Sequence, residues 1–183
     1  MKTCLNEQIH TFLGKNMKQK NNLTNILFCI YCLVLIWVVL FKASFSWDAI
    51  RLLVREREIN LIPFYGLGEW VFLNREMLLN IIIFVPMGTY LCMLGASAKT
   101  AVPYGFLASL GLELIELVTR LGTFDVTDLI TNTLGTAIGM CAYLLLRLLV
   151  KEKKTADRAV NIVACTVAGG VALLAVVLVL ANR

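Results

Sequence analysis

Five long apolar runs decide what this chain of 183 residues can fold into. Each is near the roughly 20 residues that an α-helix needs to cross about 30 Å of hydrocarbon. Because that layer contains no water, backbone groups must pair within each segment, which favours helices. Membrane β-barrel strands would instead show about ten residues of alternation. The sequence therefore predicts an all-α, polytopic transmembrane helix bundle of about five spans. They lie at about residues 23–41, 77–95, 101–119, 127–149 and 161–181.

Composition agrees with this prediction and sets the domain organisation. Hydrophobic residues make up 59% of the chain, against about 45–50% in soluble domains, and the mean hydropathy is +0.80. The runs leave no room for a second sizeable domain. We expect a cytoplasmic N-terminal tail at 1–22, a transmembrane domain of four spans at 23–150, and a cytoplasmic loop with a fifth span at 151–183.

Lysine and arginine predict the orientation, because cytoplasmic loops are enriched in both. The tail before residue 22 holds four lysines, and the loop "KEKKTADR" after the fourth run holds three lysines and an arginine. With five spans these regions share a side, although the loop 42–76 also carries five basic residues. We expect a multi-pass protein of the bacterial plasma membrane, with the N-terminus cytoplasmic and the C-terminus outside. The first run is too long for a cleaved signal peptide and is interpreted as a retained anchor. Met17 offers an alternative start to Met1.

The first outer loop is more than a linker. Its stretch "SFSWDAIRLLVREREI" separates apolar from charged residues, as an amphipathic helix lying in the membrane interface does. The following "NLIPFYGLGEW" has aromatic residues suited to the headgroup level. The loop is therefore interpreted as an interfacial belt, or as a lid over a site.

Three of the runs carry small and polar residues at helical spacing, which places each set on one face. Pro86 removes a backbone donor and should kink the second run. Small residues allow close helix packing, so Gly135 with Gly139 and Gly105 with Ser109 are predicted to mark packed faces, along which the third and fourth runs touch. The three sets are Asn80, Phe84 and Gly88; Gly105, Ser109, Glu113, Glu116 and Arg120; and Asp128, Asn132, Gly135 and Gly139.

The polar residues are expected to gather at the outer surface, because only the short turn "RLGTF" joins the third and fourth runs. At about 1.5 Å per residue, Glu113, Asn132 and Asn80 fall in one layer below it. A carboxylate at mid-helix costs about 2.5–3.5 kcal/mol on insertion scales and usually faces a bundle interior or cavity. These three are therefore the first candidates for a ligand site.

Four further polar residues have structural explanations beside a functional one. Asp125 is placed to be the N-cap of the fourth helix, with Asp128 at its third position. Glu116 and Arg120 are spaced as an i,i+4 ion pair. The candidate site consists of Asn80, Glu113, Glu116, Arg120, Asp125, Asp128 and Asn132.

The segments "NLIPF", "NIIIFVPMGTYL" and "ELIELVTRLGTFDVTDLITNTLGTAIG" closely resemble three blocks of the VanZ-like membrane proteins. The resemblance covers roughly residues 20–150. Glu116 stands where such proteins often have glutamine. The resemblance implies a small bacterial membrane protein, and the family takes its name from a member linked to resistance to the lipoglycopeptide teicoplanin. Outside the polar candidates, the matching residues are Asn60, Pro63, Phe64, Phe84, Pro86, Gly88, Gly135 and Gly139.

Two functions from different classes stay open at this stage. In the first, an outward-facing polar pocket binds a membrane lipid or a lipid-linked molecule of the cell envelope, with a link to teicoplanin resistance. In the second, an intramembrane enzyme acts on a lipid-linked phosphate or ester through its carboxylates and a divalent cation. A histidine-dependent mechanism is nearly excluded, because His10 is the only histidine. A transporter is disfavoured by the lack of an inverted repeat.

Cofactors and other partners receive negative predictions. No cofactor or metal ligand is assigned under the first hypothesis, and the cysteines in the apolar runs are interpreted as small apolar filler. No nucleic-acid partner is expected, because no long basic face lies outside the membrane. The oligomeric state is left unassigned.

Overall fold

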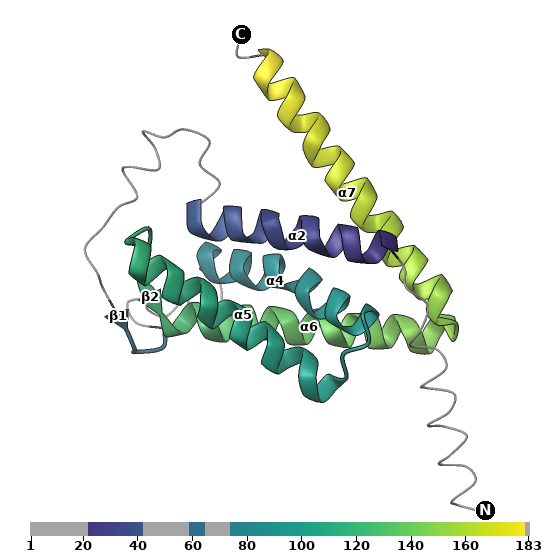
Figure 1. Ribbon diagram of the computed structural model, residues 1–183, viewed down its shortest axis with the longest axis horizontal. Coiled ribbons are helices and arrows are strands. Elements are labelled where there is room, and N and C mark those ends of the chain that lie inside the picture. Colours follow the sequence, from purple (N-terminus) through teal and green to yellow (C-terminus); the bar gives the residue numbers. More distant parts are fainter. Residues whose placement is uncertain (1–21, 42–58, 65–73, 182–183) are drawn as a thin grey trace, which may run out of the picture. The chain divides into compact units, whose positions relative to one another are not determined.

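A computed structural model describes residues 22–41, 59–64 and 74–181; beyond residue 170 it describes the backbone and, among side chains, only Val177. Within these ranges the chain is helical apart from one pair of two-residue strands and short turns (Figure 1). The predicted interfacial helix and most of the aromatic belt lie outside the described residues. The helices are α2 (Asn22–Phe41), α4 (Arg75–Met93), α5 (Ala98–Thr119), α6 (Val126–Val150) and α7 (Lys153–Ala181).

Four of the described helices, α2, α4, α5 and α6, are long and apolar enough to cross a membrane. Their ends fall within three residues of the predicted apolar runs. Large apolar side chains are exposed along them, among them Leu33, Ile82 and Leu107, as expected of surfaces that face lipid. The all-α transmembrane bundle is therefore confirmed. The fifth predicted span lies in α7 and stays a prediction, since nearly half of its side chains are not described.

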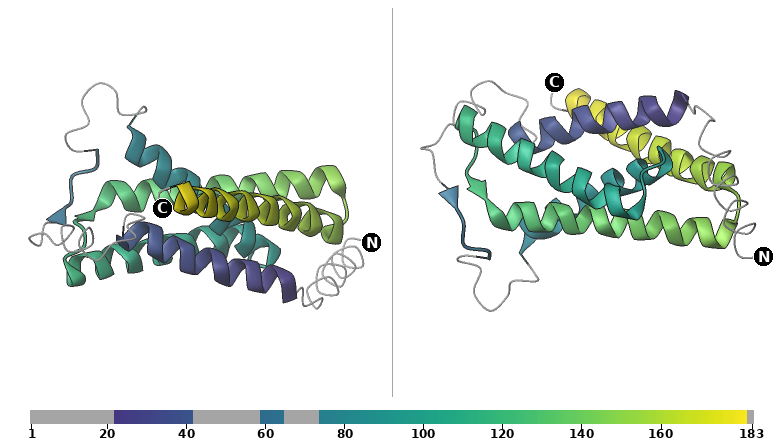
Figure 2. Two further views of the ribbon diagram at one scale, coloured as in Figure 1. Left: turned by 90° about the horizontal axis from the view of Figure 1, so that it is seen from above. Right: turned by 60° about the horizontal axis from the view of Figure 1, so that its bottom comes forward.

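The chain divides into two compact units, and residues 28–145 form the larger one. Its core consists of α2 and α4 side chains with Leu112 of α5, and Phe84 is fully buried at its centre. The views in Figures 1 and 2 show α4, α5 and α6 running alongside one another. The buried core residues are Leu35, Leu40, Phe84, Met87 and Leu112.

Helices α4 and α6 touch backbone to backbone, and glycine makes this possible. A Cβ on Gly139 would lie 1.8 Å from the carbonyl oxygen of Val85, and one on Gly135 would lie 2.3 Å from that of Ile81. From the other side, a Cβ on Gly88 would lie 1.9 Å from the carbonyl oxygen of Thr136. These distances leave no space for any side chain, so the predicted packed faces exist.

The partner predicted for the α6 glycines was nevertheless wrong. We expected Gly135 to pack against the third run, but it contacts α4. The face of α6 that meets α5 carries Asn132 and Thr136 instead, and Thr136 lies against Gly105. Residues 132 and 135 are three apart, about 60° around a helix of 3.6 residues per turn. The stripe on α6 is therefore shared between two helices: Gly135 contacts α4, and Asn132 and Thr136 contact α5.

Helix α4 contains Pro86, and α2 contacts the helix beside it. The hydroxyl of Tyr31 donates to the carbonyl oxygen of Ile83 over 2.8 Å. Because Pro86 has no N–H, the carbonyl that loses its helical donor is that of Ile82, and Tyr31 binds the next carbonyl along the chain. Tyr31 also contacts the rings of Phe28 and Tyr90. This contact holds α2 beside the Pro86 turn.

The smaller unit consists, within the described residues, of 22–27 and 146–181. At the start of α7, Lys153 forms an i,i+4 ion pair with the buried Asp157, which favours helix there. One turn further on, Asn161 Nδ2 donates to Thr24 Oγ1 over 3.0 Å, and both side chains are buried. This bond ties the first turn of α2 to the third turn of α7.

Candidate functional site

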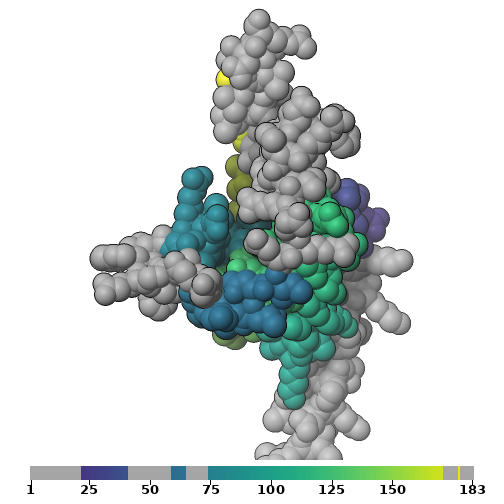
Figure 3. Space-filling view, turned by 90° about the vertical axis from the view of Figure 1, so that its left-hand side faces the viewer, coloured from purple at the N-terminus to yellow at the C-terminus, as the bar shows by residue number. Residues whose placement is uncertain are grey.

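The polar residues of the larger unit meet where α5 ends and α6 begins. Strands β1 (Ile59–Asn60) and β2 (Phe124–Asp125) pair in parallel at this end, with Asn60 opposite Asp125. The loop segment 59–64 is thereby held against the turn between α5 and α6. In Figure 3 its blue surface adjoins the green surface of that turn. We call this end the polar end of the bundle.

Asp125 is the centre of the polar end. Its Oδ1 accepts from the backbone N–H of Thr127 over 2.7 Å. Asp125 is therefore the N-cap of α6, as predicted. Its Oδ2 accepts from Asn60 Nδ2 over 3.0 Å. Its backbone N–H donates to Oε2 of Glu113 over 2.9 Å. One residue therefore connects the start of α6 with the loop and with the middle of α5.

A second contact fixes the loop segment. The backbone N–H of Phe64 donates to Thr127 Oγ1 over 3.0 Å, and Phe64 has a left-handed backbone with φ 60°. This conformation is uncommon for a bulky residue and marks a constrained turn. Phe64 belongs to a family motif that the sequence shows, whereas nothing in the sequence distinguishes Thr127 from any other threonine of an apolar helix.

Helix α4 joins the polar end through Asn80. Its Nδ2 donates to Asp128 Oδ1 over 2.7 Å. Asp128 lies in the first turn of α6, as predicted, where the helix dipole favours a carboxylate. Asn80 and Asp128 are both partly buried. Their contact links α4 to α6 at the polar end.

Asn132 lies one turn deeper and has an unusual environment. It is 3% exposed, and its Nδ2 donates to Ser109 Oγ over 2.9 Å. Its Oδ1 is buried and finds no hydrogen-bond partner among the described residues. A buried acceptor without a partner costs about 1–3 kcal/mol. Such a group needs an explanation, and a missing donor is the simplest one.

The carboxyl groups of α5 are both buried, with Glu113 at 2% and Glu116 at 6% exposure. Glu116 lies against the turn, where a Cβ on Gly122 would be 2.2 Å from its Oε2. Glu113 is within electrostatic range of Asp125, Asp128 and Glu116. Four carboxyl groups thus share a small volume.

The alternative interpretation of Arg120 as an ion-pair partner of Glu116 was wrong. Arg120 is exposed and makes no ion pair within the described ranges. It is the C-cap of α5 with φ 62°, so it has left the helical spacing that an i,i+4 pair requires. As an exposed residue, Arg120 is not part of the buried polar cluster.

The predicted polar layer is thus only partly connected. Each of Asn80, Glu113 and Asn132 has its own partner on another element or turn. In the part of the chain that the structure describes, no group of three or more His, Cys, Asp or Glu side chains is arranged to hold a metal ion. A ligand site and the divalent cation of the enzyme hypothesis both stay predictions.

Fold and polar end together define a polytopic α-helical membrane protein with a buried cluster of carboxyl and amide groups at one end of its bundle. The model of the VanZ/LLP1 family matches residues 28–147 of this chain. A curated relative, "Protein VanZ" of Enterococcus faecium, is 34% identical over 157 residues, which cover 84% of this chain and 89% of the relative. No solved structure matches. The chain belongs to the VanZ/LLP1 family.

Proposed function

We propose that the polar end binds the head group of a membrane lipid or of a lipid-linked cell-envelope molecule. The observation that carries the proposal is the buried Oδ1 of Asn132, which lacks a donor among the described residues. A hydroxyl or amine of a ligand would supply that donor. Glu113 and Asp128, within electrostatic range of each other, offer further acceptors for a polyol or amine head group.

The surroundings of the polar end suit an amphiphile. Segment 59–64 is tied to the start of α6 by hydrogen bonds, yet its large apolar side chains are exposed. Polar acceptors beside exposed apolar surface match a molecule with a polar head and an apolar tail. The tail would then leave toward the bilayer along this segment. Its exposed apolar residues are Ile59, Leu61, Ile62 and Phe64.

Mass spectrometry of the purified protein tests this proposal. We expect wild-type protein, extracted in mild detergent from bacterial membranes, to retain a defined amphiphile. Asn132→Ala should lose most of it, whereas Thr133→Ala should retain it, because the one hydrogen bond of the Thr133 hydroxyl among the described residues goes to the carbonyl oxygen of Leu129 in its own helix. Equal retention by both variants would refute binding at Asn132.

The orientation of the chain is part of the proposal. We infer that the N-terminus is cytoplasmic, which puts the polar end outside and the linker before α7 inside. In a background without native cysteines, a cysteine at Thr155 should be shielded from an impermeant reagent in intact cells. One at Ile62, which is exposed, should react. The reverse pattern would place the site on the cytoplasmic side.

An external site connects the chain to envelope-acting antibiotics. We propose that the bound molecule is one whose amount or accessibility changes sensitivity to teicoplanin, a lipoglycopeptide with an apolar tail. The family membership supports this, as does an amphiphile site that faces outward. The phenotype of site variants decides it, as argued in the Discussion.

A second candidate function rests on the carboxyl groups. Glu113 and Glu116 are buried within electrostatic range of each other, as an intramembrane enzyme acting on a lipid-linked phosphate or ester would need for acid–base chemistry. Conversion of the retained amphiphile into a product during incubation with the protein would favour this function over binding alone.

A further inference from the structure

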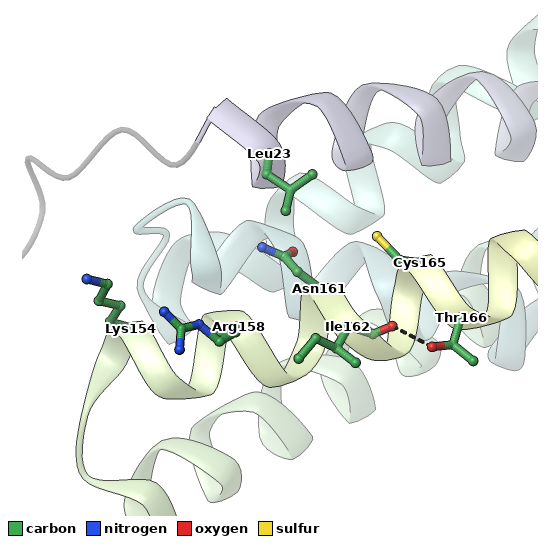
Figure 4. Close-up of a pocket in the computed structure, with 7 residues that line it drawn as sticks. All are labelled: Leu23, Lys154, Arg158, Asn161, Ile162, Cys165 and Thr166. Carbon is green, nitrogen blue, oxygen red and sulfur yellow. Dashed lines mark hydrogen bonds between the residues drawn. The ribbon is translucent and has the colours of Figure 1, made fainter.

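The smaller unit contains a cavity that the proposed function does not use. Its volume is about 380 Å³, at the low end of the roughly 300–1,000 Å³ typical of small-molecule sites. The cavity lies between the first turns of α2 and the first half of α7 (Figure 4). Its lining residues are Leu23, Lys154, Arg158, Asn161, Ile162, Cys165 and Thr166.

Two cationic side chains stand at one end of this cavity. Lys154 and Arg158 are one turn apart on α7 and exposed, and neither forms an ion pair with a described residue. Their neighbours differ, since Lys153 pairs with the buried Asp157. Because Lys153 engages Asp157, no carboxylate of the described residues forms an ion pair with Lys154 or Arg158. Paired lysine and arginine side chains suit a phosphate group.

A buried acceptor lies beside the same cavity. Asn161 is 6% exposed, and its Nδ2 donates to Thr24 Oγ1. Its Oδ1 is buried and has no hydrogen-bond partner among the residues described. Figure 4 shows this amide between the two helices, beside the cavity. An amide oxygen can only accept, so the group that satisfies it must carry a hydroxyl or an N–H.

The remaining wall of the cavity is mostly apolar. Leu23 and Ile162 are exposed apolar residues that line the cavity. The hydroxyl of Thr166 is already used, since it donates to the carbonyl oxygen of Ile162 over 2.9 Å. This side therefore offers mostly apolar contact, which suits the first methylenes of an acyl chain.

We propose that this cavity binds a phosphodiester that bears a hydroxyl group, with the glycerol phosphate head group of an anionic lipid as the prime example. Lys154 and Arg158 hold the phosphate, Asn161 accepts from the head-group hydroxyl, and Leu23 and Ile162 contact the chain. The site is separate from the polar end, because every lining residue belongs to the smaller unit. Soluble glycerol phosphate, a phosphomonoester, also offers a phosphate and hydroxyl groups, so the test must separate the two sources.

Native mass spectrometry with added dioleoyl phosphatidylglycerol tests the site. The Lys154→Gln/Arg158→Gln variant should retain about 30-fold less of this lipid than wild type, since each of the two basic residues contributes about 1 kcal/mol at a lipid surface and about 1.4 kcal/mol corresponds to a factor of ten. Lys151→Gln is the matched control and should match wild type, because Lys151 is exposed nearby but does not line the cavity. Equal retention by the double variant and wild type would overturn the proposal.

Two further probes distinguish the sources and the role of Asn161. Dioleoyl phosphatidylmethanol has the same charge but no hydroxyl, and it should bind several-fold more weakly; equal binding would refute the contact with Asn161. Displacement of phosphatidylglycerol by millimolar soluble glycerol phosphate would assign the site to a soluble ligand, and no displacement would assign it to lipid. The double variant should leave teicoplanin sensitivity unchanged, which separates this site from the polar end.

Discussion

Gly139→Leu is expected to prevent the protein from accumulating in a folded form. A Cβ at this position would lie 1.8 Å from the carbonyl oxygen of Val85, and backbone cannot move aside as a side chain can. Overpacking a buried contact commonly costs about 1–3 kcal/mol, and a forced separation of α4 and α6 should reach the top of that range or exceed it. The total stability of a folded domain is only about 5–15 kcal/mol.

Fluorescence-detected size exclusion and thermal melting in detergent measure this effect. Gly135→Leu should behave like Gly139→Leu, because its Cβ would lie 2.3 Å from the carbonyl oxygen of Ile81. Gly111→Leu is the matched control, since nothing lies within 4 Å of a Cβ there, and it should melt at or above the wild-type temperature. If Gly139→Leu had the same melting temperature as Gly111→Leu, the glycine face of α6 would be in contact with lipid and not with α4.

These glycines also mark the limit of what could be predicted from the sequence. The spacing of Gly135 and Gly139 predicted a packed face, and that face exists. The same spacing gave no information about which helix packs there, because α4 and α5 both carry a small residue at a suitable place, Gly88 and Gly105. Only the structure shows that Gly135 and Gly139 pack against α4, and that Gly105 of α5 packs against Thr136 on a neighbouring face of α6.

Helix boundaries were predictable because they follow from the solvent. The second run was expected at 77–95 and α4 spans Arg75–Met93; the fourth was expected at 127–149 and α6 spans Val126–Val150. A polar residue at either end of an apolar run marks where hydrocarbon gives way to water. The N-cap at Asp125 was predictable for a different reason, since it depends only on neighbouring residues.

The pairing of segment 59–64 with the turn before α6 could not be predicted. Two strands of two residues each have no periodicity, and Asn60 and Asp125 are 65 positions apart. Their similarity to family motifs drew attention to both residues but gave neither one a partner. Non-local contacts of single side chains leave no pattern in one sequence, and they are what brings this loop to the polar end.

Replacement of the Glu113 carboxyl group by an amide is expected to abolish function while the fold remains. In Glu113→Gln, an amide oxygen replaces the carboxyl oxygen that accepts from the backbone N–H of Asp125 over 2.9 Å, so the contact that orders the turn persists. What changes is the capacity of a side chain that is 2% exposed to hold and release a proton. Glu76→Gln is the matched control, because Glu76 is exposed in the first turn of α4.

Asn132→Ala tests the same site through a neutral group. The substitution breaks the bond to Ser109, which contributes about 1 kcal/mol, but it also removes a buried acceptor that has no donor among the described residues. Loss of the hydrogen bond lowers the stability of the fold and removal of the unpaired acceptor raises it, so the variant should fold with a melting temperature close to wild type. Loss of function in a folded variant would then reflect the loss of a ligand contact.

The readout is teicoplanin sensitivity of a sensitive bacterial host that expresses each variant at matched membrane levels. If wild type alters the sensitivity, Glu76→Gln should do so equally, and Glu113→Gln and Asn132→Ala should return the host to its basal value. Retention of the full phenotype by both site variants would make the polar end purely structural, and so would failure of both to accumulate. In that case Asp125 would serve as an N-cap that holds a loop, and the amphiphile would have to bind elsewhere on the bundle.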